Sequence, residues 1–231
     1  MNDMRFTTTF YRCAAVCSFA SVITTLLLVY LPELFHREPG FEGRMALVHD
    51  PAYVVRSWDY LLHPFLTLMA GLGMAMRMRR VASGSALIGL LGFTLWGFTE
   101  AGQQTLTLFA FDAWRVAYAT ADELTRSQIR IQTAMYDGLW DAMYFLLLCG
   151  FAISHLALGQ AMVRCKGLTR TVGILLLLAF ALTLSYMLGE LKLPSIPGAL
   201  ADRIELFLQP VGRTLIGVWL WRMAREEEPL R

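Results

Sequence analysis

The sequence has little charge and lacks the motifs of the common enzyme classes. Only 16% of its 231 residues are charged, whereas a soluble domain carries about 25%, so the composition argues against an ordinary soluble domain. No HExxH, GxSxG, phosphate-loop or dinucleotide fingerprint occurs, which leaves zinc proteases, serine hydrolases and nucleotide-binding enzymes without support. The net charge is only +2, and such a balance indicates no nucleic-acid partner.

Long apolar runs make up most of the chain, of which 56% is hydrophobic. Each of six runs is about long enough to cross a hydrocarbon core of roughly 30 Å, and all are too long for barrel strands. The sequence therefore predicts an all-α polytopic membrane protein, with six transmembrane helices in one bundle that occupies residues 1–231 as a single domain. The predicted spans are 11–33, 52–76, 82–110, 134–163, 168–190 and 204–224. Asp50 followed by Pro51 is typical of a helix start and predicts the beginning of the second span.

The basic residues predict the orientation of these spans. Short loops that are rich in Lys and Arg stay in the cytoplasm, and the side of the membrane that holds the N-terminus collects most of these residues. They are Arg5, Arg12, Arg77, Arg79, Arg80, Arg164, Lys166, Arg170, Arg222, Arg225 and Arg231. We therefore expect both termini to be cytoplasmic.

Two longer segments, 34–50 and 111–133, are expected to form outer loops. The second of them is too polar to span a membrane. Within it, Thr120 with Glu123 fits a capping box and predicts a helix that starts beside them. That helix either runs unbroken into the fourth span or bends at Gly138.

Polar residues stand one helical turn apart inside five of the six runs. Residues four apart share one face of a helix, and an ionised group that faces lipid costs several kcal/mol. The rows are therefore expected to converge on a polar cavity that opens toward the outer face. They consist of Asp59 with His63, Glu100 with Gln103 and Gln104, Asp137 with Asp141 and Tyr144, Tyr186 with Glu190, and Glu205 with Gln209 and Arg213. The residues predicted to bind a ligand are Asp59, His63, Glu100, Gln103, Gln104, Asp141, Tyr144, Gln209 and Arg213.

Arg213 is the only basic residue that the sequence places well inside a span. A guanidinium cannot shed its proton and must be paired or hydrated, so a carboxylate partner is expected. The candidate partners are Glu100, Asp141 and Asp59. A structural ion pair and a ligand-binding role explain this position of Arg213 equally well. His63 also has two interpretations, because a lone histidine in such a row is more often a hydrogen-bonded packing residue than a ligand.

The polar cluster does not single out one chemistry. His63, Glu100 and Asp141 include donors that zinc or iron accepts, but one histidine is a weak signal, so we predict no metal site and specify no cofactor. The leading hypothesis is binding or transport of a small polar or amphipathic ligand taken from the outer side. The alternatives are a membrane-embedded enzyme, metal-dependent or not, that acts on a lipid or isoprenoid-like substrate, and a structural or assembly subunit of a membrane complex. The predicted partners are the lipid bilayer and a small-molecule or lipid ligand, and the oligomeric state stays open.

The beginning and the end of the chain resemble a known family. The similar segments are TTTFYRCAAVCSFASVITTLLL, KGLTRTVGILLLLAFALTLSYMLGELKLP and FLQPVGRTLIGVWLWRM. With a Gly after the fourth span, Gly173 in an apolar run and a final G-x-W-L, they are similar to the uncharacterised bacterial membrane proteins called domain of unknown function 4386. The resemblance implies a six-helix bundle in the bacterial cytoplasmic membrane and no catalytic residue. The paired aspartates and histidine of the second and fourth spans are not assigned to that family's pattern.

Overall fold

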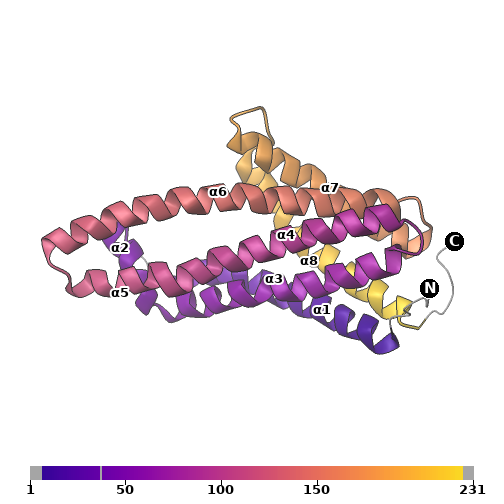
Figure 1. Cartoon of the computed structure of the whole chain (residues 1–231), viewed down its shortest axis with the longest axis horizontal. Coiled ribbons are helices and arrows are strands. Elements are labelled where there is room, and N and C mark those ends of the chain that lie inside the picture. The colour runs from indigo at the N-terminus through magenta and orange to yellow at the C-terminus, as the bar shows by residue number, and fades with distance from the viewer. Residues whose placement is uncertain (1–6, 37, 226–231) are drawn as a thin grey trace.

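The computed structural model describes residues 7–36 and 38–225, and within these two stretches the chain is helical with no strand. Its helices are α1 (Thr8–Tyr30), η1 (Leu31–Leu34), α2 (Gly40–Ala46), η2 (Leu47–His49), α3 (Pro51–Met78), α4 (Ser83–Leu106), η3 (Thr107–Phe111), α5 (Asp112–Thr120), α6 (Glu123–Met162), α7 (Gly167–Glu190) and α8 (Gly198–Met223). They form an elongated bundle, with α1 beginning and α8 ending at one end, the terminal end, and with α2 and α5 at the other, the α2–α5 end (Figure 1). Arg5 and Arg231, which contributed to the predicted orientation, lie outside the described residues.

Local capping explains where two of the long helices begin. Asp50 Oδ1 accepts hydrogen bonds from the backbone N–H groups of Ala52 and Tyr53, at 2.8 and 3.2 Å. Pro51 occupies the first position of α3, so the predicted start of the second long helix is confirmed. The turn into α7 requires Gly167, because its φ of +58° is a conformation that residues with a side chain rarely adopt.

The predicted outer loop 111–133 is instead a helical hairpin at the α2–α5 end. α4 continues through the π-turn of η3 into α5, and α6 starts after a two-residue turn. Asp122 caps α6, since its Oδ1 accepts a hydrogen bond from the Thr125 N–H at 2.9 Å. The predicted capping box of Thr120 and Glu123 is therefore wrong, because an aspartate directly before the helix takes its place.

The helix α6 runs unbroken through Gly138, which decides between the two predicted courses. At 1.5 Å per residue its 40 residues extend about 60 Å, twice a hydrocarbon core of roughly 30 Å. The first half of α6 accordingly projects beyond α7 and α8 (Figure 1). The other predicted loop, 34–50, is also partly helical, since it contains α2 and η2.

Four helical segments are long and apolar enough to cross a membrane. They are Thr8–Leu34, Pro51–Met78, Glu123–Val163 and Gly167–Glu190. Helices α4 and α8 are of similar length, but Glu100 in α4 and Arg213 in α8, among other polar residues, lower their mean hydropathy. The all-α class and the presence of helices that can span a membrane are confirmed, whereas six spans and their orientation stay predictions.

Close packing at the terminal end forms the main core. Trp219 is fully buried there, and its Nε1 donates to Thr169 Oγ1 at 2.9 Å, which joins α8 to α7. Helices α4 and α6 approach backbone to backbone where Gly92 meets Gly150, since a Cβ added to either glycine would lie 2.6 Å from a backbone nitrogen of the other helix. A second, smaller core at the α2–α5 end consists of Met45, Phe111, Tyr118, Ile129 and Tyr136.

Candidate functional site

A cavity of about 520 Å³ lies among α1, α3, α4, α6, α7 and α8. The polar residues of its lining include the buried side chains of His63, Glu100 and Arg213. The apolar residues of its lining include Leu147 of α6 and Leu182 of α7. Five of the nine residues predicted to bind a ligand line this cavity, namely His63, Glu100, Tyr144, Gln209 and Arg213.

The polar row of α8 forms a chain of hydrogen bonds along the cavity. Gln209 is central to this chain, because its Nε2 donates to Glu205 Oε1 and its Oε1 accepts from Arg213 Nη2 at 3.4 Å. The Tyr186 hydroxyl of α7 donates to Glu205 Oε2 at 2.9 Å. At the opposite end of the chain, Arg213 Nη1 donates to Thr67 Oγ1 of α3. The predicted spacing of this row is thus confirmed, and the row links α8 to both α7 and α3.

Arg213 does not form the predicted ion pair. Its guanidinium contacts two neutral side chains, Thr67 and Gln209, and no carboxylate of the described residues lies within ion-pair distance of it. Asp141 is exposed and lies outside the cavity lining. Glu100 borders the same cavity without forming an ion pair with Arg213, so the site holds a buried carboxyl group and a buried guanidinium that are not in direct contact.

Glu100 reaches the cavity, whereas the two glutamines that follow it in α4 do not. Glu100 is 5% exposed, and its buried Oε2 accepts no hydrogen bond from any described residue. Gln103 instead donates from Nε2 to the Trp140 carbonyl oxygen at 3.0 Å and so joins α4 to α6. Gln104 is buried as well but is not part of the cavity lining. Neither glutamine reaches the cavity lining, contrary to the predicted ligand-binding role.

His63 borders the cavity and is also held by packing. Its Nδ1 lies 2.6 Å from Thr24 Oγ1 of α1. Its ring meets Trp96 edge to face, with ring centroids 6.3 Å apart. The contact with Thr24 agrees with the hydrogen-bonded packing role, and the position of the ring in the lining also gives His63 access to a ligand.

Asp59 and Asp141 do not join the site. Asp59 is buried in α3 outside the cavity lining, and its Oδ2 has no hydrogen-bond partner among the described residues. Asp141 stays outside because the cavity reaches α6 only from Tyr144 onward. No group of three His, Cys, Asp or Glu side chains that could hold a metal occurs in residues 7–36 and 38–225. The alternative metal set of His63, Glu100 and Asp141 is therefore not brought together.

The site includes two hydroxyl groups, of Thr67 and Thr24, that the polar rows of the sequence do not predict. Thr67 stands four residues after His63, so it continues the row that begins at Asp59 by one more turn. Extending that row would have identified Thr67 as a partner. Thr24 carries no comparable signal, because its contact with His63 depends on how α1 packs against α3.

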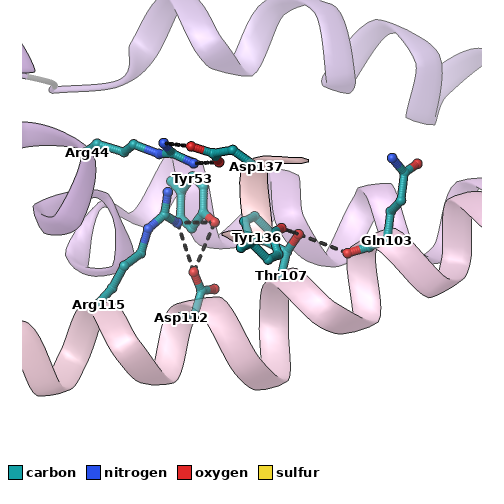
Figure 2. A network of polar contacts seen from close by, with 8 residues as sticks. All are labelled: Arg44, Tyr53, Gln103, Thr107, Asp112, Arg115, Tyr136 and Asp137. Carbon is teal, nitrogen blue, oxygen red and sulfur yellow. Dashed lines mark hydrogen bonds and ion pairs between the residues drawn. The ribbon is translucent and has the colours of Figure 1, made fainter. Parts of the chain in front are cut away.

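A second polar network lies at the α2–α5 end and is shown in Figure 2. Arg44 of α2 and Asp137 of α6 form a two-point ion pair with N–O distances of 2.8 and 2.5 Å. In α5, Arg115 Nη1 donates to Asp112 Oδ1 at 2.8 Å, and the Tyr53 hydroxyl donates to the same oxygen at 3.1 Å. The network joins α2, α3, α5 and α6, so Asp137 has a structural role away from the cavity.

Aromatic rings fill the space between these ion pairs. Phe111 stacks on Tyr136, with ring centroids 4.4 Å apart. The guanidinium carbons of Arg44 and Arg115 lie 5.0 and 4.3 Å from the centroid of Phe111, which is within the range of cation–π attraction. The Tyr136 hydroxyl is 2.7 Å from Thr107 Oγ1 (Figure 2). These contacts hold the projecting half of α6 against α2 and α5.

Two carboxyl groups at the α2–α5 end have lowered pKa values. The Tyr118 hydroxyl donates to Glu42 Oε1 at 2.6 Å, and this hydrogen bond is the largest cause of the lowered pKa of Glu42. The His36 N–H donates to Asp50 Oδ2 at 2.8 Å and is the largest cause of the lowered pKa of Asp50. In both cases a donor stabilises the ionised form of the carboxyl group.

No protein-family model, curated protein or solved structure matches the chain. A functional conclusion therefore rests on the cavity, its charged side chains and the helices that hold them. The resemblance to the domain of unknown function 4386 family stays a proposal.

Proposed function

We propose that the chain is a multi-pass protein of the bacterial cytoplasmic membrane whose cavity binds or transports a small polar or amphipathic ligand. In this proposal α1, α3, α4, α6, α7 and α8 cross the bilayer, both termini are cytoplasmic, and the cavity opens to the outer face. Membership of the domain of unknown function 4386 family belongs to the same proposal and supplies no catalytic residue.

The surfaces of α4 and α8 support their assignment as spans. With 24 and 26 residues they extend about 36 and 39 Å, which exceeds a hydrocarbon core of roughly 30 Å. Glu100 and Arg213 are buried, as charged groups inside membrane spans normally are. The exposed Asp202 and Arg203 lie near the start of α8 and are part of the cavity lining. Large apolar side chains are exposed along both helices, including Leu87, Ile88, Leu91, Phe98, Phe207 and Val211.

The observation that carries the proposed function is the mixed lining of the cavity. Buried His63, Glu100 and Arg213 offer charge and hydrogen bonds, and Leu147 and Leu182 are among the apolar residues of the same lining. A volume of about 520 Å³ falls within the roughly 300–1,000 Å³ that is typical of small-molecule sites. A small amphiphile matches both surfaces, because its head meets the charged groups while its apolar part is buried against the walls.

Filling the cavity tests this proposal. Ala179 of α7 lines the cavity, whereas its neighbour Leu178 is 52% exposed and lies outside the lining. We expect wild-type protein in nanodiscs to carry co-purified amphiphiles in native mass spectra, and we expect Ala179→Trp to lose them. Leu178→Trp is the matched control and should keep them. Equal retention by the two variants, or wild-type protein without any bound amphiphile, would contradict the proposed function.

Reporter fusions test the orientation separately. Reporters inserted at Ser83, the first residue of α4, and at Lys166, directly before α7, are expected to behave as cytoplasmic. A reporter at Leu124, the second residue of α6, is expected to behave as external. The opposite result at Ser83 or Lys166 would overturn the orientation and the outer opening of the cavity.

A further inference from the structure

Glu100 provides a buried acceptor, its Oε2, that no donor of the described residues satisfies. Its side chain borders the cavity from α4, and none of the described residues donates a hydrogen bond to its carboxyl group. Burying a carboxylate without a partner is costly. A ligand in the cavity can remove this cost by bringing an N–H donor, and a positively charged donor is the strongest choice.

Aromatic rings stand around the same part of the cavity. Trp96 precedes Glu100 by four residues and therefore lies on the same face of α4, and both line the cavity. Tyr60 of α3 and Tyr144 of α6 line it as well. Aromatic rings attract ammonium groups through their negative faces. A carboxylate together with such rings favours a cationic group on the ligand.

Arg213 provides the complementary anion site from α8. Among the described residues, Thr67 and Gln209 accept from two of its five N–H donors, which leaves three. Both partners are neutral, and the hydrogen-bonded link to a carboxylate runs through Gln209 to Glu205. The planar fork of a guanidinium matches the oxygens of a phosphate or carboxylate group. Arg213 therefore favours an anionic group on the ligand.

We infer that the ligand is a single-chain zwitterionic amphiphile, with its ammonium group beside Glu100 and its phosphate or carboxylate group beside Arg213. This inference rests on the proposed function and names the class of ligand. An anion alone would leave Glu100 without a donor, and a cation alone would leave Arg213 without a counter-ion. A cavity of about 520 Å³ has the size of a site for one drug-sized molecule, which favours one chain along the apolar walls over two.

The experiment compares ligands of equal chain length on the full-length protein in nanodiscs. The zwitterions are lauroyl lysophosphatidylethanolamine and dodecylphosphocholine, and the ligands with charge of one sign are dodecyl phosphate and dodecyltrimethylammonium. Saturable binding of each radiolabelled ligand is measured above that of empty nanodiscs. We expect lysophosphatidylethanolamine, whose ammonium has N–H donors, to bind about 10-fold or more tightly than either ligand with charge of one sign, the factor that a charge-assisted hydrogen bond contributes. The ethanolamine and choline ligands separate a hydrogen-bonded ammonium from one held by aromatic rings alone.

Variants assign the two charges to their residues. Glu100→Gln keeps the shape of the side chain and should weaken lysophosphatidylethanolamine binding about 10-fold or more, while binding of dodecyl phosphate stays equal or tightens. Arg213→Met should weaken both phosphate-bearing classes and spare dodecyltrimethylammonium, and Arg213→Lys replaces it if the methionine variant does not fold. Glu33→Gln and Arg222→Met change exposed charges outside the cavity lining and should bind as the wild type does.

Two results would overturn the inference in different ways. Equal affinity for dodecyl phosphate and the zwitterions, with no effect of Glu100→Gln, would show that the head group is not recognised as a zwitterion, although amphiphile binding itself stands. Absence of saturable binding for every ligand would remove the proposed function and the inference together.

Discussion

Replacing Gly92 by alanine is expected to separate α4 from α6 and to loosen the cavity between them. The added Cβ would lie 2.6 Å from Ser154 N and 2.8 Å from Gly150 O. Both are backbone atoms that cannot rotate away, so the helices must part by about 0.8 Å to reach ordinary contact at 3.4 Å. Overpacking of this kind costs about 1–3 kcal/mol, and the better helix propensity of alanine offsets up to about 1 kcal/mol of it. We therefore expect the free energy of unfolding to fall by up to about 2 kcal/mol.

The matched control for this substitution is Gly138→Ala in α6. No atom lies within 4 Å of a Cβ added to Gly138, so alanine should stabilise the helix by about 0.5–1 kcal/mol. Both variants are compared with the wild type by equilibrium unfolding in mixed micelles, and their amphiphile binding is measured in nanodiscs. If Gly92→Ala proves as stable as Gly138→Ala, the backbone-to-backbone approach of α4 and α6 is wrong. Weaker amphiphile binding by Gly92→Ala alone would show that this approach also shapes the cavity.

Two further predictions concern the α2–α5 end. Because the pKa of Asp50 is lowered in the fold, the ionised carboxylate stabilises the fold at pH values above the usual carboxyl pKa of about 4. This stabilisation is lost as the pH falls through the pKa of Asp50 in the folded state. Asp50→Asn keeps the helix cap but has no ionisable group at this position. Its free energy of unfolding should therefore fall less than that of the wild type between neutral and acidic pH. Equal losses would show that Asp50 is not the group that stabilises the fold at neutral pH. For Arg44 and Asp137, whose side chains are 29% and 43% exposed, a double-mutant cycle with Arg44→Met and Asp137→Asn should give a coupling of about 1 kcal/mol. A coupling near zero would show that the ion pair contributes nothing.

Properties that depend on one helix at a time could be predicted from the sequence. Each of the six apolar runs overlaps one long helix, because a continuous apolar stretch needs little besides its length to identify it. The row of Glu205, Gln209 and Arg213 follows from helical period alone, and the hydrogen bonds within it confirm that spacing. The cap at Asp50 is equally local, since its acceptor and donors lie within three residues of each other.

Contacts between helices could not be predicted in the same way. Depth along a helix was estimated from residue number, but the direction in which each row faces depends on how the helices rotate and pack. Asp141 was therefore assigned to a cavity that begins one turn later on α6, at Tyr144. Arg213 was expected to find a carboxylate and instead contacts Thr67. Asp137 pairs with Arg44, which lies in a segment that the sequence marked only as a loop.

Helices α4 and α8 supply Glu100 and Arg213 to the site. The same two helices are not among the four that are apolar enough to span a membrane. One cause explains both facts, since Glu100 and Arg213 lower the hydropathy of the helices that carry them. Packing and hydrogen bonds from neighbouring helices hold α4 and α8 in the bundle. The close approach at Gly92 packs α4 tightly against α6, and Ser18 Oγ of α1 donates to the Arg213 carbonyl oxygen of α8 at 2.7 Å. Both contacts come from neighbouring helices, so the two helices that carry the charges of the site depend on the bundle around them for their position.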